Sequence, residues 1–351
     1  MKIDQNNIMA IVDSAKNFMQ DKLIVIIYNS IGFTKKIDSS QEDTDFFSNQ
    51  EIGEIFDALI QENIKILPYN NEMDFINSVT NNIIETNNII VWNLSRQGTY
   101  NNQKSLITSF CDFNKIPYIG SSVYSMNLSR HKLHFQKILK SLNLCDIPSY
   151  SINEFKNTNI IDGNFILKKA KGSASRGIKE ETSNICYTKM KNYINENNIS
   201  KDYIIQKYIK GYEIEVPLLQ IDGKFVPFGI SGIKINNLKY FSNQIMPEEM
   251  FDSNYSFYNF EYFAINQLNF INCNFIYSSA VKIAEILELK DYCRIDFRID
   301  SQYNLYCFDI STTPYLTKHS SPNFLFETVN LNHSDLLLSI IGAFSSNTDN
   351  H

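Results

Sequence analysis

Two runs of alternating apolar and polar residues stand near the end of the chain, "RIDFRI" at 294–299 and "LYCFDIS" at 305–311. Strict alternation over four to eight residues is typical of a half-buried strand, and two such runs around the turn-forming segment "DSQYN" predict a hairpin. With its turn centred on Gln302 and Tyr303, the hairpin places Asp296 directly across from Asp309. Two carboxylates would then face each other across the ladder.

Facing carboxylates repel each other unless a positive charge lies between them. A magnesium ion could supply that charge, because it prefers one or two carboxylates together with phosphate oxygens. The same register places Ser311 across from Arg294. The alternative is a solvated hairpin face whose acids pair with Arg294 and Arg298, and the pattern leaves both interpretations open. The same alternation predicts Leu305 and Cys307 on the charged face.

A second group of residues could bind phosphate. The segment "LKKAKGSASRGIKE" (167–180) places lysines at the end of an apolar strand, directly before a loop of small residues. Backbone amides of such loops can cradle phosphate oxygens, although an ordinary exposed turn has the same composition. Lys132 lies on the preceding predicted helix, and Glu213 follows a glycine where a carboxylate could accept hydrogen bonds from a ribose.

The elements that must position these groups alternate between strand and helix. Apolar runs at 23–29, 65–69 and 88–94 predict strands, a helix is expected at 51–62, and together they indicate an α/β layer over roughly residues 20–120. No G-x-G-x-x-G motif follows the first strand, so this layer is not predicted to bind a dinucleotide. An amphipathic helix precedes it and is expected to pack on the body of the protein or on a second subunit.

Composition excludes several classes of protein. The chain has 351 residues, of which 43% are hydrophobic and 20% charged, which is typical of globular domains rather than disordered segments. A net charge of -6 gives no basic footprint for nucleic acid. The chain has no apolar run of membrane-spanning length and no secretion signal, and its six scattered cysteines indicate reduced thiols, so no membrane partner and a cytoplasmic location are expected.

Five segments, in this order along the chain, resemble the D-alanine:D-alanine ligase family of ATP-grasp enzymes: "IPYIGSSVYSMNLSRHK", "FILKKAKGSASRG", "YIIQKYIKGYE", "LKYFS" and "RIDFRID…FDISTTPYLTKHSSP". The resemblance extends from about Leu23 to Phe344. It implies an α/β ATP-grasp fold in which an N-terminal βαβ domain precedes two α+β domains that clamp ATP. It also implies that a carboxylate is activated as an acyl phosphate before an amine attacks it.

The resemblance also implies roles for individual residues. Arg294 would stabilise the transition state, with Lys239 and Tyr240 on a mobile loop that reaches into the site, and magnesium would bind at Asp296, Asp309 and Ser311. The ATP phosphates would be bound by Lys132 and Lys168 and covered by a closing loop that contains Ser173, Ser175 and Gly177. The adenine would lie against a hinge formed by Gln206, Lys207, Tyr208 and Ile209, and Glu213 would accept hydrogen bonds from the ribose. Ser320 lies where the acceptor carboxylate would be held.

Several positions depart from the family pattern. Asp309 replaces a glutamate and Ser311 an asparagine, so a second magnesium would bind weakly, and Tyr315 replaces a glycine and is expected to crowd the acceptor pocket. Ala174 replaces a serine that orients the first substrate. The glutamate and histidine of the family's D-alanine subsite have no counterpart here, and Arg96 is instead expected to favour an acidic group.

The resulting hypothesis is an ATP-dependent carboxylate-amine ligase that joins small molecules other than two D-alanines. Alternatives are a D-alanine:D-alanine ligase proper, an ATP-binding homologue without catalysis, and a phosphotransferase. Expected boundaries are 1–22 for the N-terminal helix, 23–122 for the pre-ATP-grasp domain, and 123–205 and 206–351 for the two ATP-grasp subdomains. A homodimer is a further expectation.

Overall fold

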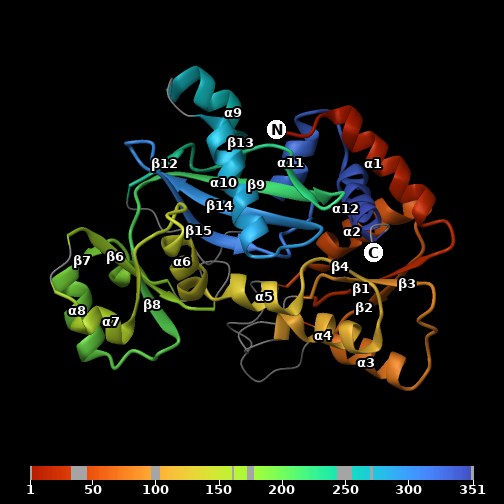
Figure 1. Ribbon diagram of the computed structural model, residues 1–351, viewed down its shortest axis with the longest axis horizontal. Helices are drawn as coiled ribbons and strands as arrows, with labels where there is room; N and C mark the ends of the chain where they lie inside the picture. The colour runs from red at the N-terminus through yellow and green to blue at the C-terminus, as the bar shows by residue number, and fades with distance from the viewer. Residues whose placement is uncertain are drawn as a thin grey trace.

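Three β-sheets, each with its own helices, make up the part of the chain that the computed structural model describes (Figure 1). That part comprises residues 2–32, 46–95, 103–159, 162–171, 178–242, 255–268 and 272–348. Within it, no helix combines the length and the apolar character needed to cross a bilayer. All six cysteines are free thiols.

The first sheet is parallel, has the strand order β2-β1-β3-β4, and lies at the lower right of Figure 1. Alternate residues of β1 belong to two different cores, because helices cover both faces of the sheet. This explains the continuous apolar runs, and the strands predicted at 23–29, 65–69 and 88–94 are confirmed. The elements are β1 (Leu23–Ile27), α2 (Asn49–Gln61), β2 (Ile66–Tyr69), α3 (Glu72–Thr80), β3 (Ile89–Asn93), the 3₁₀ turn η2 (Gln103–Ser105), α4 (Leu106–Asn114) and β4 (Tyr118–Ile119).

The amphipathic N-terminal helix packs on the body of the same chain. Helix α1 (Gln5–Phe18) begins at Asp4, whose side chain accepts a hydrogen bond from the Asn7 amide, and its apolar face packs on the closing helix α12 (His333–Thr348). At their contact a Cβ added to Gly342 would overlap the backbone carbonyl and side chain of Ile11. This face is therefore used within the chain and does not argue for a dimer, so the homodimer stays a prediction.

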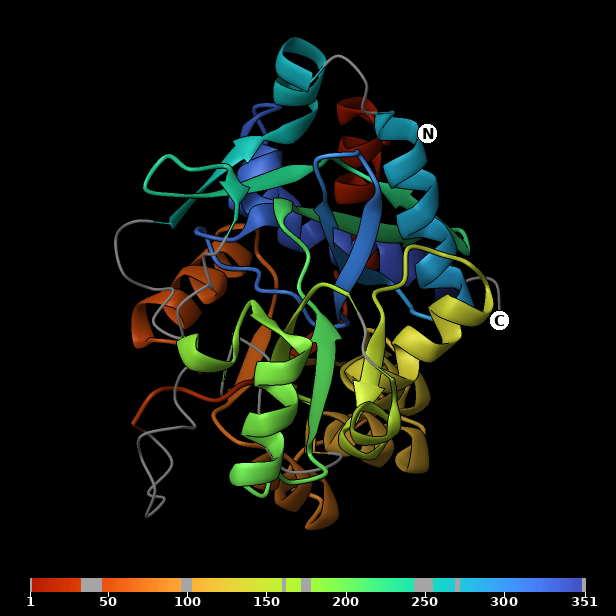
Figure 2. The same ribbon diagram turned by 90° about the vertical axis from the view of Figure 1, so that its left-hand side faces the viewer.

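The second sheet is small, antiparallel and ordered β5-β8-β6-β7. It has its own aromatic core, in which Phe155 packs against Phe165 and Tyr187. Both Figure 1 and Figure 2 place it beneath the largest sheet. The elements are α5 (Val123–Arg130), α6 (Lys132–Ser141), β5 (Ser149–Ser151), α7 (Ile152–Asn157), β6 (Asn164–Lys169), the 3₁₀ turn η3 (Glu180–Thr182), β7 (Ile185–Cys186), α8 (Tyr187–Glu196) and β8 (Tyr203–Lys207).

The third sheet has the order β13-β11-β9-β14-β15, with β10 and β12 also paired to β9. Its longest strand, β9 (Gly211–Ile221), turns into β10 (Lys224–Pro227) at Asp222 and Gly223, both of which have the positive φ that a tight Asp-Gly hairpin turn requires. The other elements are β11 (Ser231–Ile235), β12 (Tyr240–Phe241), β13 (Tyr255–Asn259), α9 (Phe260–Phe263), a π-helical turn (Ala264–Leu268), α10 (Cys273–Ile286), β14 (Tyr292–Ile299), β15 (Leu305–Ser311) and α11 (Ser321–Glu327).

The hairpin β14-β15 has the predicted register at its open end, where Asp296 lies opposite Asp309 and Arg294 opposite Ser311. The prediction fails nearer the turn. A bulge after Asp296 skips Phe308, so that Cys307 pairs with Phe297. Because one extra residue reverses the side-chain alternation, Leu305 and Cys307 are buried in the apolar core and do not share the charged face.

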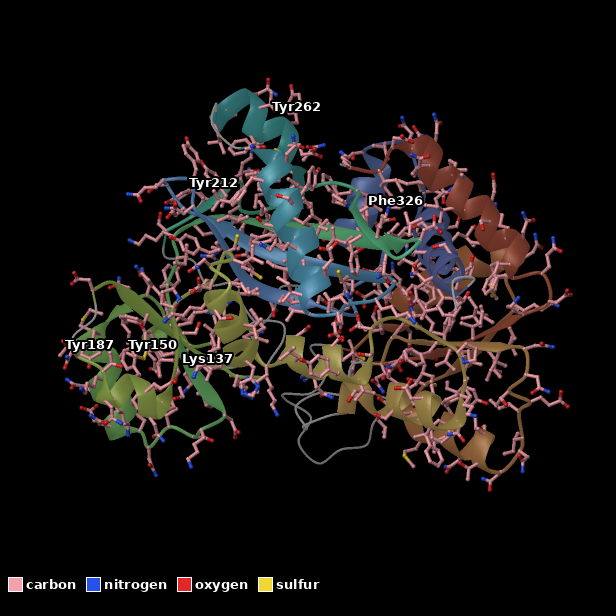
Figure 3. All side chains as sticks on the ribbon, viewed as in Figure 1. Lys137, Tyr150, Tyr187, Tyr212, Tyr262 and Phe326 are labelled. Atoms are coloured by element: carbon pink, nitrogen blue, oxygen red, sulfur yellow. The ribbon has the colours of Figure 1, made fainter. Side chains whose placement is uncertain are left out.

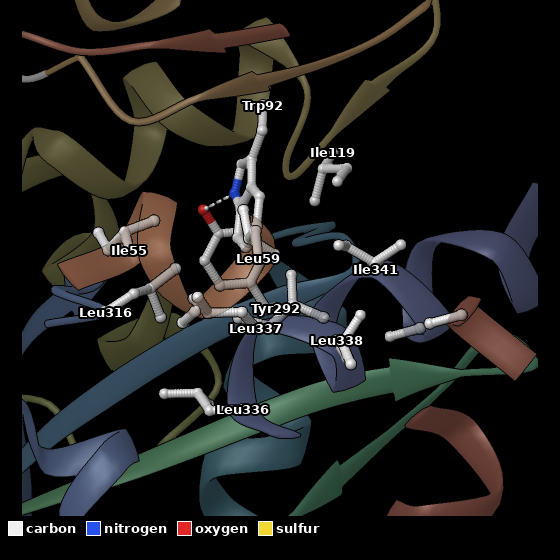
Figure 4. Close-up of a cluster of buried hydrophobic side chains, with 14 of the residues drawn as sticks. Ile55, Leu59, Trp92, Ile119, Tyr292, Leu316, Leu336, Leu337, Leu338 and Ile341 are labelled. Carbon is white, nitrogen blue, oxygen red and sulfur yellow. Dashed lines mark hydrogen bonds between the residues drawn. The ribbon is translucent and has the colours of Figure 1, made fainter. Parts of the chain in front are cut away.

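Buried polar contacts join the first and third sheets. The Trp92 indole N–H donates to the Tyr292 hydroxyl at 3.1 Å, inside a cluster of aliphatic side chains (Figure 4). One residue earlier, the Asp291 carboxylate accepts from the Gly120 amide at 2.7 Å and from the Asn347 side chain at 3.0 Å. These bonds satisfy polar groups at the junction and fix the end of β4 against the start of β14.

Replacing Gly342 with alanine should destabilise the protein. Alanine is favoured over glycine in a helix by about 1 kcal/mol, but the overlap with Ile11 should cost about 1–3 kcal/mol. We therefore expect Gly342→Ala to lower the free energy of unfolding by up to about 2 kcal/mol, measured by urea denaturation.

The same substitution at Gly53, inside α2, is the matched control. No atom outside the helix lies within 4 Å of a Cβ at that position, so only the helix propensity should act, and stability should rise by about 0.5–1 kcal/mol. Equal effects of the two substitutions would contradict the close packing of α1 on α12.

Candidate active site

Three carboxylates lie in one row across the third sheet. Asp296 on β14 pairs with Glu215 on β9 and with Asp309 on β15, and alternation places all three side chains on the same face. Glu215 and Asp296 are buried. Such a row is unfavourable without positive charges among the acids.

Arg294 neutralises the two buried acids of this row. Its Nε and Nη2 donate to the two carboxylate oxygens of Asp296 at 2.7 and 2.8 Å, and Nη2 also lies 2.9 Å from Glu215 Oε1. Charge-assisted bidentate pairs of this kind are strong and hold the guanidinium in one orientation. Nη1 has no acceptor among the described residues. Arg294 is therefore anchored along one edge and has donors left at the other end.

Lys132 neutralises the third acid. Its ammonium lies 2.8 Å from Asp309 Oδ1, while its backbone amide donates to the Ala170 carbonyl at the end of β6. The lysine begins helix α6, so the contact joins the small-sheet half of the protein to the hairpin of the third sheet. The acids of the hairpin thus pair with Arg294 and Lys132, whereas Arg298, the other partner considered from the sequence, binds elsewhere.

Burial raises the pKa of both Glu215 and Asp296 above ordinary carboxylate values. Arg294 opposes the rise in both, while the neighbouring acids, including Glu215 beside Asp296, add to it. Both buried carboxylates would therefore be stabilised by a further positive charge nearby.

Lys168, on β6 of the small sheet, lies close to Lys132 and Asp309. Its ammonium donates to Gln206 Oε1 at 3.0 Å and lies 5.6 Å from the Phe308 ring centroid. The Gln206 amide in turn donates to Ser149 Oγ at 3.0 Å. Burial, together with the positive charges of Lys132 and Arg298, lowers the pKa of Lys168 to about 8.

The predicted adenine hinge continues from β8. The amides of Lys207 and Tyr208 donate to the Pro148 and Asn164 carbonyls. The Ile209 carbonyl accepts from Arg298 Nη1 at 2.9 Å, and Arg298 also holds the Glu213 carboxylate. The hinge and the predicted ribose acceptor therefore lie together.

Lys239 and Tyr240 are not brought to this face, contrary to the expectation of a loop that reaches into the site. Tyr240 pairs with Tyr212 across the sheet, and their rings lie 5.1 Å apart. Tyr212, labelled in Figure 3, alternates with Glu213 and faces the opposite side of β9, against the apolar core. The Lys239 ammonium lies 4.1 Å from the Phe263 ring centroid, on the same aromatic cluster. The register of β12 on β9 therefore turns Tyr240 away from Arg294, and the ring contacts of Lys239 hold it on the same side as Tyr240.

The residues predicted for the acceptor pocket follow the hairpin. Ser320 caps α11, accepting from the Asn323 amide, and its hydroxyl donates to the Thr317 carbonyl at 2.6 Å. The Tyr315 ring packs edge-on against Phe47 of the first sheet's domain, with centroids 5.7 Å apart. The pocket assignment of both residues stays a prediction. Arg96, Ser173, Ser175 and Gly177, as well as Ala174, lie outside the described residues.

The described residues fit a magnesium ion that also binds phosphate. No three His, Cys, Asp or Glu side chains among them form a metal cage, and magnesium needs no such cage when phosphate oxygens complete its shell. Asp309 is 32% exposed, and its Oδ2 makes no hydrogen bond to the described residues. Both carboxylate oxygens of Asp296 accept hydrogen bonds from Arg294, so only their remaining lone pairs could bind a metal ion. Ser311 lies across from Arg294.

Two residues of this region were missed as site residues. Glu215 follows Glu213 by two positions, a spacing that places both on one face of a strand, but nothing local indicates that β9 lies beside β14. Arg298 was considered only as a partner of the hairpin acids. Its position opposite Glu213 follows from the pairing of β14 with β9.

Comparison with known proteins identifies the family to which the chain belongs. The model of the "D-ala D-ala ligase C-terminus" family matches residues 164–342. A D-alanine–D-alanine ligase of Prochlorococcus marinus (strain NATL1A) is 24% identical over 240 residues, 64% of this chain, and the match spans 65% of that relative's length. The relative from strain NATL2A is 25% identical over the same shares of both chains.

Solved structures agree with the fold. A D-alanine–D-alanine ligase from Bacillus anthracis complexed with ATP has a TM-score of 0.62 and 17% identity, covering 92% of this chain and 97% of that one. The VanG D-Ala:D-Ser ligase from Enterococcus faecalis has a TM-score of 0.64 and 15% identity, covering 93% and 100%. The fold is therefore the ATP-grasp fold. The chain belongs to the D-alanine–D-alanine ligase family, whose C-terminal region matches half of it.

The lowered pKa of Lys168 can be tested by competitive labelling. The neutral amine is the nucleophile, so a pKa of about 8 should make Lys168 react with acetic anhydride over a pH range centred near 8, whereas ordinary lysines titrate near about 10.4. The measurement is the acetylation of each lysine peptide against pH, read by mass spectrometry. A Lys168 profile identical to that of exposed lysines would contradict the burial described above.

Proposed function

We propose that the chain is an ATP-dependent carboxylate-amine ligase. The observation that carries the proposal is the 2.8 Å contact between Lys132 and Asp309. It joins a lysine expected to bind phosphate, from one half of the ATP-grasp fold, to a carboxylate expected to bind magnesium, from the other half. A site for a metal-bound phosphoryl group requires these two kinds of residue side by side.

The chemistry follows from these side chains. A substrate carboxylate oxygen attacks the γ-phosphorus of ATP and ADP leaves; the substrate amine then attacks the acyl carbon, loses a proton, and phosphate leaves. Lys132 and Lys168 hold phosphate oxygens and offset their charge. Arg294, anchored along one edge by Asp296 and Glu215, directs Nη1 at the oxygen on which charge develops. Asp309 and Asp296 would hold a magnesium ion, which would neutralise negative charge on the phosphates.

The substrates are small molecules, and we propose that at least one of them is not D-alanine. The proposal rests on the changed residues Asp309, Ser311 and Tyr315 and on the lack of the family's subsite glutamate and histidine. D-alanine, named for both curated relatives, fits at least as well on the comparisons alone. It therefore belongs in any test of substrates.

The test is ADP release from ATP and magnesium, measured with a panel of small carboxylates and amines, singly and in pairs. Release that needs one particular pair would support the ligase and name its substrates. Rapid dipeptide formation from D-alanine alone would overturn the proposal of another substrate. ATP binding without release from any pair would favour an ATP-binding homologue without catalysis.

Asp296→Asn should abolish turnover and spare nucleotide binding. The substitution removes a metal ligand and half of the anchor of Arg294, so we expect kcat to fall about 10²-fold or more, as for loss of one preorganised electrostatic group. ATP affinity without magnesium should change little, because the hinge and lysines remain. The measurements are ADP release and calorimetric ATP binding.

Asp13→Asn, on the exposed side of α1, is the control for loss of one carboxylate. Thermal unfolding of both variants separates misfolding from a direct effect on catalysis. An Asp296→Asn enzyme that stays folded and keeps wild-type turnover would refute the metal assignment.

A further inference from the structure

Arg298 makes the densest set of polar contacts near the predicted nucleoside site. Its Nε and Nη2 both donate to Glu213 Oε2, at 3.0 and 2.6 Å, and its Nη1 donates to the Ile209 carbonyl at 2.9 Å. The guanidinium carbon also lies 5.8 Å from the Tyr208 ring centroid and 5.5 Å from that of Phe241. One side chain therefore fixes both the carboxylate and the hinge.

The two oxygens of Glu213 are used unequally. Both donors of Arg298 converge on Oε2, and Oε1 makes no hydrogen bond to the described residues. Oε1 also does not belong to the fully buried oxygens without a hydrogen-bond partner, which means that part of its surface is exposed and accessible to a ligand. Arg298 thus sets the torsion of the carboxylate and presents Oε1 as a free acceptor.

The backbone amides of the hinge are also used unequally. The amides of Lys207 and Tyr208 are already bonded to backbone carbonyls, whereas the Ile209 amide makes no hydrogen bond to the described residues. By holding the Ile209 carbonyl, Arg298 restrains the residue whose N–H is left for a base edge. Its contacts therefore connect one free donor and one free acceptor, which an adenosine could use together.

Charge gives a second reason for an arginine here. Glu213 is buried, with 6% of its side chain exposed, and its negative charge would repel the phosphates of a nucleotide. Arg298, with 13% of its side chain exposed, cancels that charge without using Oε1. Glu213 can then accept from a sugar hydroxyl while it repels the phosphates much less.

We propose that Arg298 is a positioning residue for the nucleoside: it preorganises Glu213 and Ile209 as a two-point clamp and so determines the preference for a ribonucleotide over a deoxyribonucleotide. This inference rests on the proposed function, since it takes ATP to be the ligand. It predicts that loss of Arg298 weakens sugar recognition more than it weakens binding of the phosphates.

The experiment is calorimetric titration of the full chain with ATP, 2'-deoxy-ATP and 3'-deoxy-ATP in the presence of magnesium. Wild type should bind ATP about tenfold more tightly than the analogue that lacks the contacted hydroxyl, which is the value of one hydrogen bond to a charged acceptor. Arg298→Met should weaken ATP binding about tenfold or more and bring that preference close to one. Arg298→Lys should be intermediate, because a single ammonium cannot hold both acceptors in the same plane.

Removing Arg298 leaves a buried charge on Glu213 and could unfold the chain, so the double variant Arg298→Met/Glu213→Gln is needed. It removes both charges and should fold while still lacking the sugar preference. Lys137→Met, which removes an ion pair with Glu154 at the surface of α6, is the control and should bind all three nucleotides as wild type does.

The outcomes separate the two proposals. Failure of wild type to bind any of the nucleotides overturns the proposed function together with this inference. Binding by wild type without sugar preference, or an equal loss of affinity for all three nucleotides in the folded arginine variants, overturns the inference alone, because a merely structural residue would have that effect.

Discussion

The repulsion among three carboxylates in one row is the constraint that the site must satisfy. Pairing of β9, β14 and β15 brings Glu215, Asp296 and Asp309 together, and a sheet cannot bury such a row without compensating charge. Arg294 supplies it from two residues before Asp296 on β14, while Lys132 comes from a helix of another part of the chain. The position of that helix is therefore coupled to the electrostatics of the sheet.

Polar contacts link the two halves of the ATP-grasp fold near the site. The small sheet has its own aromatic core and does not need the large sheet to bury it. Near the site its links to the large sheet include Lys132 with Asp309 and Arg298 with the Ile209 carbonyl. Each contact involves a residue predicted to bind ATP or its magnesium, so a bound nucleotide would lie where the two halves meet.

The sequence patterns predicted those features of the fold that depend on the local alternation of apolar and polar residues. The parallel strands, the N-terminal amphipathic helix and the pairing of Asp296 with Asp309 follow from periodicity and turn residues. The bulge at Phe308 does not, because Cys307 and Phe308 are both apolar and either could face the core, so the additional residue leaves no local signal. The face taken by Lys239, and the approach of Arg298 to Glu213, depend on which distant strand pairs with β9, and no single segment carries that information. Site residues on the strands were therefore easier to predict than their partners.

The packing of α1 on α12 has a consequence for biosynthesis. The ribosome makes α1 long before α12, the helix that covers its apolar face with Gly342 at the contact, because every other described element lies between them in the chain. Until then the apolar stripe of the nascent chain has no native partner and is open to chaperones or to other nascent chains. Closure of this helix pair thus waits for the synthesis of α12, even if the first sheet folds while synthesis continues.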